Sequence, residues 1–240
     1  MIVVSLTSWT KRITYVKQVV ESIMNNTVKP DRVYLNLSST EFSGIELPKD
    51  LVEYFDSDDR LIINWVDGPN TKAMKKIFPI LDYLQDDDII IDADDDILFP
   101  EDFIESRLSD FDKMGRRYCI TSNSHNTVGF NHKMKVVSAM SLFQKKMFNH
   151  WKRFVTQGIL DTQNDDRTYL TLMWLNGYYN RCCSKWTIHE LLESKYNMDL
   201  GNSMSGEKCI KMGKIYDRIA QNEFSKITDK QIVDCFGFWK

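Results

Sequence analysis

The sequence has few cysteines, and none of them form a paired motif. Its five cysteines are odd in number, and no two of them are separated by two residues. A structural zinc site and a disulfide framework are therefore not expected, and reduced thiols in a cytoplasmic protein are the simplest interpretation. The five are Cys119, Cys182, Cys183, Cys209 and Cys235.

Long apolar runs are also missing. No window approaches the run of about 18 apolar residues that a membrane-spanning helix needs. The apolar start at 1–6 is too short for a signal peptide and runs straight into the polar stretch 7–12. We therefore expect a cytoplasmic location. Basic and aromatic side chains at 145–153 leave open a peripheral contact with the inner membrane face and a lipid-linked acceptor.

An excess of basic charge is absent as well. The 240 residues include 31 Lys and Arg against 34 Asp and Glu, for a net charge of −3. Binding to a phosphate backbone needs a basic excess, so nucleic acid is not expected as a partner. A hydrophobic content of 42% is typical of a globular chain of this length with one main domain.

Strand-like and helix-like patterns alternate through the first hundred residues. Short apolar, β-branched runs are separated by segments with helical spacing of apolar residues. This alternation predicts an α/β fold with a mostly parallel, Rossmann-like sheet flanked by helices, and ligands at the carboxyl ends of its strands. The predicted strands are 2–6, 33–37, 61–66 and 89–91, and the predicted helices are 16–24, 47–55 and 71–84, the last kinked by Pro79.

The second half is less regular. It predicts a helix over 103–114, strands over 118–121 and 136–143, and a helix over 167–176 that Gly177 ends. Beyond about residue 195 the chain is polar. We expect one domain over 1–195, divided into a nucleotide-binding half at 1–100 and an acceptor half at 101–195, with a small helical appendage at 196–240.

The acidic stretch 86–96 carries the strongest chemical signal. Its first part, 86–88, lies between a predicted helix and a strand, where solvated acid is common. Its second part, Asp92–Asp96, follows three isoleucines of the sheet interior, so its carboxylates repel one another at low dielectric. Mg²⁺ or Mn²⁺, bound with substrate phosphates, relieves such repulsion. If the strand continues, Asp92, Asp94 and Asp96 share one side. The glycine and distal glutamate of an EF-hand are missing.

Four segments together resemble the nucleotide-binding half of GT-A-fold glycosyltransferases. They are 2–9, 33–37, 65–69 with Lys72, and 89–100. The resemblance is greatest to bacterial family-2-like enzymes that build surface polysaccharides, and it extends over roughly residues 1–185. Its core is the DxD motif Asp94-Asp95-Asp96, which is weak alone but more specific after a buried fourth strand.

The resemblance implies a metal-dependent glycosyltransferase of the hexosyltransferase type. Such an enzyme moves a sugar from a nucleotide diphosphate-sugar to a hydroxyl of a glycan or lipid-linked glycan. We expect a UDP-sugar as the donor and inversion of the configuration at its anomeric carbon. Asp94 and Asp96 would hold Mn²⁺ or Mg²⁺ across the two phosphates, where the metal stabilises the leaving diphosphate. Asp95 would face the donor sugar. His189 is a candidate additional metal or phosphate ligand.

The resemblance also assigns residues to the nucleotide. Thr7 and Ser8 would line the nucleoside pocket, and Asp67 would contact the base. Arg12 would lie near the base or ribose, with a solvated residue at the start of a helix as an equal alternative. Lys72 follows a loop that opens a predicted helix, where backbone N–H groups and a lysine suit a diphosphate, although a surface lysine is the competing interpretation.

Inverting transfer needs a general base for the acceptor hydroxyl. Family-2-like enzymes place a carboxylate before a helix in the second half, and 164–170 has that form. Asp166 is the first candidate and Asp165 the second; either is also an ordinary helix-start acid. His125 follows the strand 118–121 and would reach the same edge of the sheet, near the diphosphate or donor sugar.

Two other functions stay open at this stage. A sugar-phosphate nucleotidyltransferase has a related fold but should carry a glycine-rich loop after its first strand, where 5–10 has no glycine. A non-enzymatic carbohydrate- or calcium-binding module would leave Asp67 and Asp166 without a role. The response to nucleoside diphosphates separates these alternatives from the leading one.

Overall fold

A seven-stranded sheet is the centre of the molecule. The computed structural model describes residues 1–121, 124–127, 134–137, 140–152, 165, 168, 169, 172, 173, 176–183, 190 and 191. In the sheet the strands follow the order β10-β6-β9-β4-β1-β2-β3. They are β1 (Ile2–Thr7), β2 (Arg32–Ser38), β3 (Leu61–Val66), β4 (Ile89–Ala93), β6 (Tyr118–Thr121), β9 (Leu142–Gln144) and β10 (Tyr179–Cys182).

Most neighbouring strands run parallel, as the alternating pattern predicted. β1 pairs in parallel with β2 and with β4, β2 with β3, and β10 with β6. The short strand β9 is the exception, because it runs antiparallel to both β4 and β6. The sheet is therefore mixed, and its first four strands match the predicted ranges to within two residues.

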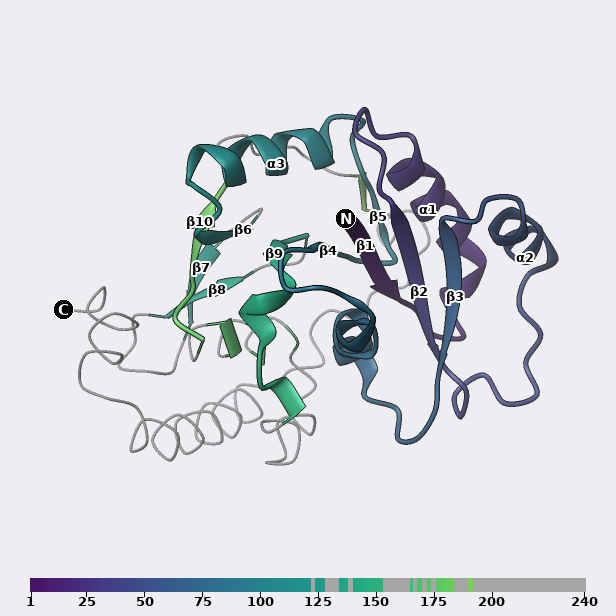
Figure 1. Ribbon diagram of the computed structural model, residues 1–240. Helices are drawn as coiled ribbons and strands as arrows, with labels where there is room; N and C mark the ends of the chain where they lie inside the picture. The colour runs from purple at the N-terminus through teal and green to yellow at the C-terminus, as the bar shows by residue number, and fades with distance from the viewer. Residues whose placement is uncertain are drawn as a thin grey trace.

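Helices cover the sheet on both sides (Figure 1). The α-helices within residues 1–121 are α1 (Val16–Met24), α2 (Lys49–Asp56) and α3 (Phe103–Lys113), and η1 (Ile13–Tyr15) precedes α1. The end of α1 meets the start of α3: the Thr27 N–H donates to the Glu101 carbonyl at 2.6 Å, and the Ile104 N–H donates to the Asn26 side chain at 2.9 Å. These helices bury the apolar residues Val16, Val19, Val20, Ile23, Phe103 and Phe111.

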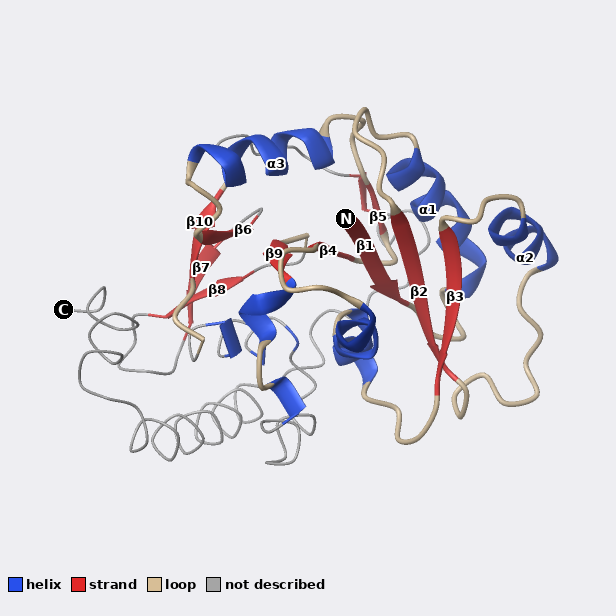
Figure 2. Ribbon diagram, viewed as in Figure 1, coloured by secondary structure: helices blue, strands red, loops and turns tan. Residues whose placement is uncertain are grey.

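The 71–84 segment differs from its prediction. It forms two 3₁₀ helices, η2 (Lys72–Lys76) and η3 (Phe78–Tyr83), and not one kinked α-helix. Figure 2 shows the strands and helices of both types by colour. Pro79 lies at the start of η3, where a missing N–H costs least. Residues 74–78 are all buried, because η2 packs on β1 and β2 and Phe78 belongs to an aromatic cluster. That cluster contains Phe78, Phe143, Phe148, Trp151 and Tyr169.

The predicted strand 136–143 is also wrong as a single element. It is split into β8 (Met134–Val137) and β9, and Met140 between them has a positive φ of 70°, which a strand residue does not adopt. β8 pairs with β7 (Ser124–Thr127) in a separate two-stranded sheet. A second small sheet joins β5 (Ile97–Leu98) to β11 (Glu190–Leu191), and η5 (Lys145–Phe148) follows β9.

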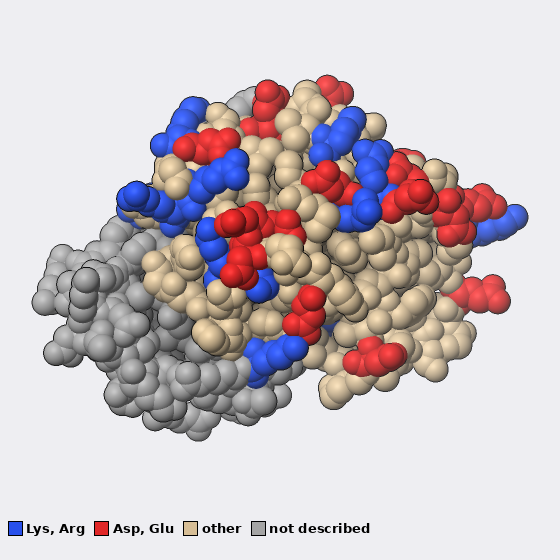
Figure 3. Space-filling model, viewed as in Figure 1, with Lys and Arg blue, Asp and Glu red and all other residues tan. Residues whose placement is uncertain are grey.

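The charged surface is mixed in sign (Figure 3). Lys145, Lys146 and Lys152 each form an ion pair with an aspartate, at 2.7 to 2.8 Å. Phe148 is buried, and Trp151 stacks on Phe78 with ring centroids 5.0 Å apart. The lysines that suggested membrane contact thus form ion pairs at the surface, and the two aromatic residues pack in the aromatic cluster. No helix of the described part is long and apolar enough to cross a membrane. The expected appendage at 196–240 lies outside the described residues.

Candidate functional site

A cavity of about 420 Å³ lies beside the carboxyl ends of β1 and β4. The residues that follow β1 form one wall, η2 forms another, and the turn after β4 closes it. This is the edge at which parallel α/β sheets bind ligands, and the volume suits a small organic molecule. The lining residues are Thr7, Ser8, Trp9, Arg12, Glu41, Asn70, Lys72, Ala73, Lys75, Lys76, Asp94 and Asp95.

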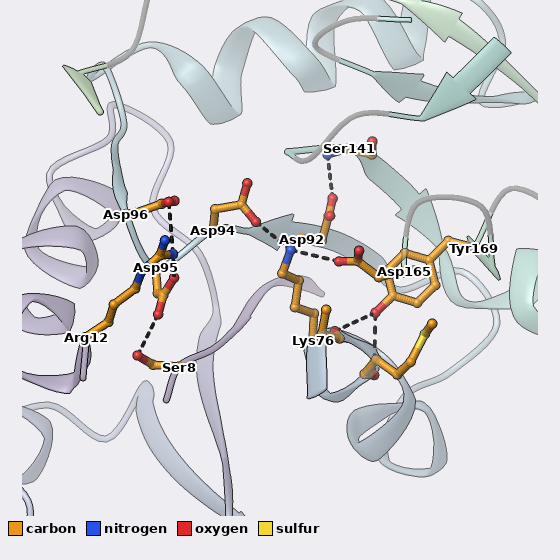
Figure 4. Close-up of polar contacts among 12 residues, drawn as sticks. Ser8, Arg12, Lys76, Asp92, Asp94, Asp95, Asp96, Ser141, Asp165 and Tyr169 are labelled. Carbon is orange, nitrogen blue, oxygen red and sulfur yellow. Dashed lines mark hydrogen bonds and ion pairs between the residues drawn. The ribbon is translucent and has the colours of Figure 1, made fainter. Parts of the chain in front are cut away.

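The first polar cluster joins the segment after β1 to the turn after β4. The Arg12 Nη1 atom lies 2.9 Å from a carboxylate oxygen of Asp95 and 2.9 Å from one of Asp96. The Ser8 hydroxyl donates to the second oxygen of Asp95 at 2.6 Å. Arg12, Ser8 and Asp95 are buried, so these contacts fix the DxD turn against the end of β1 (Figure 4). The guanidinium of Arg12 is directed at carboxylates, and its contact with a base or ribose stays a prediction.

The second cluster has Lys76 at its centre. Its ammonium donates to Asp94 at 2.5 Å and to Asp165 at 2.9 Å (Figure 4). The Lys76 side chain is only 10% exposed, and the three groups come from η2, the turn after β4 and a helical residue of the second half. The negative charges of Asp165, Asp94 and Asp92 raise the pKa of Lys76 well above its usual value, against the opposing effect of burial.

A polar row on one face of the sheet supports η2. Side chains alternate between faces along a strand, so Ser5 of β1, Asn36 of β2 and Asn64 of β3 all face the same side. The Ser5 hydroxyl donates to the Lys76 carbonyl, and the Asn36 amide donates to the Ser5 hydroxyl at 2.9 Å. Asn64 donates in turn to Asn36 at 2.7 Å. These buried hydrogen bonds place the backbone of Lys76, and hence its side chain, over β1.

Tyr169 joins the helical residue Asp165 to the same segment. Its hydroxyl donates to the carbonyls of Ala73 and Met74 at 3.2 and 3.4 Å, and its ring is fully buried in the aromatic cluster. Asp165 lies one helical turn before Tyr169. The hydroxyl therefore fixes the distance between Asp165 and η2, and with it the contact between Asp165 and Lys76.

Asp92 lies within β4 and behind the site. It is 1% exposed and accepts a hydrogen bond from the Ser141 N–H at 2.5 Å. Burial raises the pKa of this carboxyl to about 7, against the opposing effect of the Lys76 charge. β4 ends at Ala93, so the strand does not continue through Asp96. The strand alternation that would put Asp92, Asp94 and Asp96 on one side therefore does not apply beyond Ala93. Asp95 and Asp96 both contact Arg12.

Negative charge exceeds positive charge among these residues. Five carboxylates, those of residues 92, 94, 95, 96 and 165, face two cations, Arg12 and Lys76, for a formal surplus of three negative charges. Burial and the neighbouring charge of Asp94 raise the pKa of Asp96 to about 6, and burial raises that of Asp95. A bound cation would offset this surplus.

The residues present fit a metal that substrate phosphates help to bind. Among the described residues no three Asp, Glu, His or Cys side chains form a ready-made metal cage. Mg²⁺ and Mn²⁺ do not require one, because they are commonly bound by one or two carboxylates, substrate phosphates and water. Asp94 and Asp96, with side chains 24% and 15% exposed, have the accessibility that such a mode needs.

Lys72, Lys75 and Asn70 form the opposite wall of the cavity. Lys72 is exposed and has a positive φ of 52°, and its N–H donates to the Asn70 side chain at 2.9 Å. Lys75 is buried and donates to the same Asn70 oxygen at 2.5 Å. Arg12 and Lys76 line the cavity as well, but both are paired with aspartates, and the carboxylates of Glu41, Asp94 and Asp95 also line it. Lys72 and Lys75 are therefore the basic side chains of this wall that suit an anionic ligand. The loop 67–71, which carried the prediction for Lys72, leads into this wall.

The remaining predicted residues are placed as follows. Thr7 lines the cavity, and its hydroxyl donates to the Asn36 carbonyl at 2.7 Å. Asp67 is exposed after β3, where it accepts from Ser39 at 2.7 Å, and it does not line the cavity. His125 lies in β7, where it pairs with Val136. Asp166 and His189 lie outside the described residues, although Glu190, next to His189, pairs with Leu98 just after the DxD turn.

Two features were missed by the sequence interpretation. Lys76 was not distinguished from its neighbouring lysines, although it is the cation that contacts both Asp94 and Asp165. The acidic segment 86–88 was expected to be solvated, and Asp86 and Asp87 are indeed exposed. Asp88 is buried and accepts from the Gln85 N–H at 2.8 Å, so that part of the expectation was wrong.

Comparison with known proteins identifies the fold. No protein-family model and no curated protein sequence match the chain. Among solved structures, TarS residues 1–349 from S. aureus align over 98% of this chain and 79% of that one, with a TM-score of 0.55 and 10% identity. The mannosyltransferase PcManGT from Pyrobaculum calidifontis, in complex with GDP-Man and Mn²⁺, aligns over 97% and 77%, with a TM-score of 0.53 and 10% identity.

A nucleotidyltransferase shares the same architecture. The 2-C-methyl-D-erythritol 4-phosphate cytidylyltransferase of Francisella tularensis aligns over 82% of this chain and 96% of that one, with a TM-score of 0.51 and 10% identity. At such identities the likeness shows the fold alone. The chain has a GT-A-type, Rossmann-like fold, a fold used by glycosyltransferases and by this nucleotidyltransferase.

Proposed function

We propose that the protein is a metal-dependent glycosyltransferase that uses a nucleotide diphosphate-sugar. The observation that carries the proposal is the junction of Asp94 with Asp165 through Lys76, at the edge of a cavity with a basic wall. A glycosyl transfer needs a donor-diphosphate site and an acceptor base close together, and these carboxylates suit the two tasks. The fold of TarS and PcManGT supports this choice.

The cavity supplies the donor side of the reaction. Lys72 and Lys75 would neutralise the diphosphate, and the segment from Thr7 to Arg12 would contact the nucleoside. Mn²⁺ or Mg²⁺, held by Asp94 and Asp96, would act as a Lewis acid toward the leaving diphosphate when bound. Arg12 keeps the DxD turn fixed, since it contacts both Asp95 and Asp96.

Asp165 is the best supported base among the described residues. Asp165 and Asp94 accept hydrogen bonds from the same Lys76 ammonium, and this contact orients the Asp165 carboxylate. In an inverting transfer this carboxylate takes the proton of the acceptor hydroxyl as that oxygen attacks the anomeric carbon of the donor. Asp166 remains the alternative base. The acceptor class we propose is a glycan, free or linked to a lipid.

A donor screen tests the proposal. Purified protein is incubated with UDP- and GDP-sugars, Mn²⁺ and candidate glycans, and release of the nucleoside diphosphate is measured. We expect release with at least one donor, and its loss in Asp96→Ala. The matched control is Asp87→Ala, because Asp87 belongs to the same acidic stretch but is exposed and paired with Lys146. Equal release by Asp96→Ala and wild type would contradict the assignment of the DxD motif.

The cytidylyltransferase neighbour supports one alternative function, transfer of a nucleotide from a triphosphate. Two observations disfavour a nucleotidyltransferase. The segment between Ser5 and Thr10 contains no glycine that would let the backbone wrap a triphosphate. The Ser8 hydroxyl and the Arg12 guanidinium already bind Asp95 of the DxD turn. The assay separates the two functions: a nucleotidyltransferase releases pyrophosphate from CTP or UTP, and a glycosyltransferase does not.

A further inference from the structure

Lys76 and the proposed metal compete for the same carboxylate. We propose that Lys76 is an internal counter-cation, which holds Asp94 until a metal-bound nucleoside diphosphate arrives. The protein then binds its metal together with the donor, and binds the metal alone only weakly. This inference rests on the proposed function and adds an order of binding to it.

The contacts of Lys76 support this role. Its ammonium is 2.5 Å from Asp94 and 2.9 Å from Asp165, and its carbonyl is held by the Ser5 hydroxyl. The neighbouring Lys75 is also buried, but its ammonium donates to the neutral Asn70 side chain. Of these two adjacent buried lysines, only the one that faces the DxD turn is placed between carboxylates.

Electrostatics predicts what happens when a metal approaches Asp94. A divalent cation and an ammonium on the same carboxylate repel each other, and this repulsion is only partly screened because the Lys76 side chain is 10% exposed. Lys76 therefore lowers the affinity of the site for the metal alone. A diphosphate changes the balance, because its negative charge offsets both cations.

The geometry gives the ammonium another position to occupy. Lys76 lines the same cavity as Lys72 and Lys75, and its side chain is a flexible four-carbon stem. It can turn from Asp94 to a diphosphate oxygen while it stays near Asp165. Asp165 would then keep a cationic neighbour throughout, and Asp94 would exchange an ammonium for a metal.

Binding of Mn²⁺ tests the inference without any turnover. Free Mn²⁺ is measured by electron paramagnetic resonance, with and without UDP or GDP, for the wild type and for Lys76→Met. We expect the wild type to bind Mn²⁺ at least about tenfold more tightly with the nucleotide than without it. In Lys76→Met, affinity for Mn²⁺ alone should rise by at least about tenfold, and the effect of the nucleotide should shrink.

Two further variants keep the test decisive. Lys76→Gln is also neutral but keeps a polar end between the carboxylates, so it should act like Lys76→Met even if the latter folds poorly. Lys146→Met removes an exposed lysine paired with Asp87 and should leave Mn²⁺ affinity unchanged, which controls for net charge.

The outcomes separate the two proposals. If Mn²⁺ and a nucleoside diphosphate bind together but neither Lys76 variant binds Mn²⁺ alone more tightly, the role of Lys76 is refuted and the proposed function stands. Wild-type protein that binds Mn²⁺ equally well with and without the nucleotide also refutes it. If no nucleoside diphosphate binds under any condition, the proposed function itself fails.

Discussion

Replacement of Asp92 by asparagine should stabilise the protein, and by an amount that depends on pH. Asp92 is 1% exposed, and burial raises its pKa from 3.8 to about 7. Between these values the unfolded chain releases a proton that the folded protein still holds, so wild-type stability falls as pH rises from about 4 to about 7. About three pKa units correspond to about 4 kcal/mol.

The asparagine side chain of Asp92→Asn keeps an acceptor for the Ser141 N–H and has no proton to lose. The advantage of this variant over the wild type should therefore be near zero at about pH 4, grow by about 1.4 kcal/mol for each pH unit, and level off above about pH 7. Urea unfolding at pH 4.5, 6 and 8, without metal, measures this difference.

The control is Asp87→Asn. Asp87 is exposed, and its hydrogen bond from Lys146 lowers its pKa, so this variant should gain no stability at pH 8. If Asp92→Asn is no more stable than wild type at pH 8, the buried carboxylate is compensated and the charge surplus inferred for the site is wrong. A gain in stability together with a loss of activity would be typical of a functional site that costs stability.

Three other variants test the contacts of the site. Arg12→Met should lower the free energy of unfolding by about 3–5 kcal/mol in urea denaturation, because Asp95 and Asp96 lose their buried cation. A loss below about 1 kcal/mol would show that Arg12 does not stabilise the two carboxylates. Tyr169→Phe should cost about 1 kcal/mol in the same assay, through lost hydrogen bonds to η2, and no loss would show those bonds to be unimportant. Asp165→Asn should reduce kcat by at least about 100-fold and leave donor affinity nearly unchanged. An unchanged kcat would show that Asp165 is not the general base and would favour Asp166.

Much of the fold could be predicted because its signals are local. The β-branched runs at 2–6, 61–66 and 89–91 are rich in apolar residues, and such strands are recognisable from a few residues. The antiparallel strand β9 is not, since its direction depends on pairing with β4 and β6 from distant parts of the chain. Met140 has a positive φ, which interrupts the predicted strand 136–143. A methionine in the sequence gives no signal of this conformation, because it is glycine that commonly adopts it.

The sequence singled out the carboxylates of the candidate site but not Lys76, the cation between two of them. Asp94–Asp96 were found because carboxylates after a buried strand are unusual. In an α-helix that buries Met74, Ile77 and Phe78, Lys76 would lie on the opposite, exposed side. The actual 3₁₀ segment is buried from Met74 through Lys76. Only the packing of Tyr169 and the sheet against η2 decides which lysine reaches the carboxylates.

Calorimetric titration of UDP and GDP into the protein, with and without Mn²⁺, tests the central claim most directly. We predict that at least one of them binds only when Mn²⁺ is present, and that Asp96→Ala abolishes this metal dependence. Failure of both nucleoside diphosphates to bind in the presence of Mn²⁺, or equal binding with and without it, would contradict a metal-dependent nucleotide-sugar site at the DxD turn.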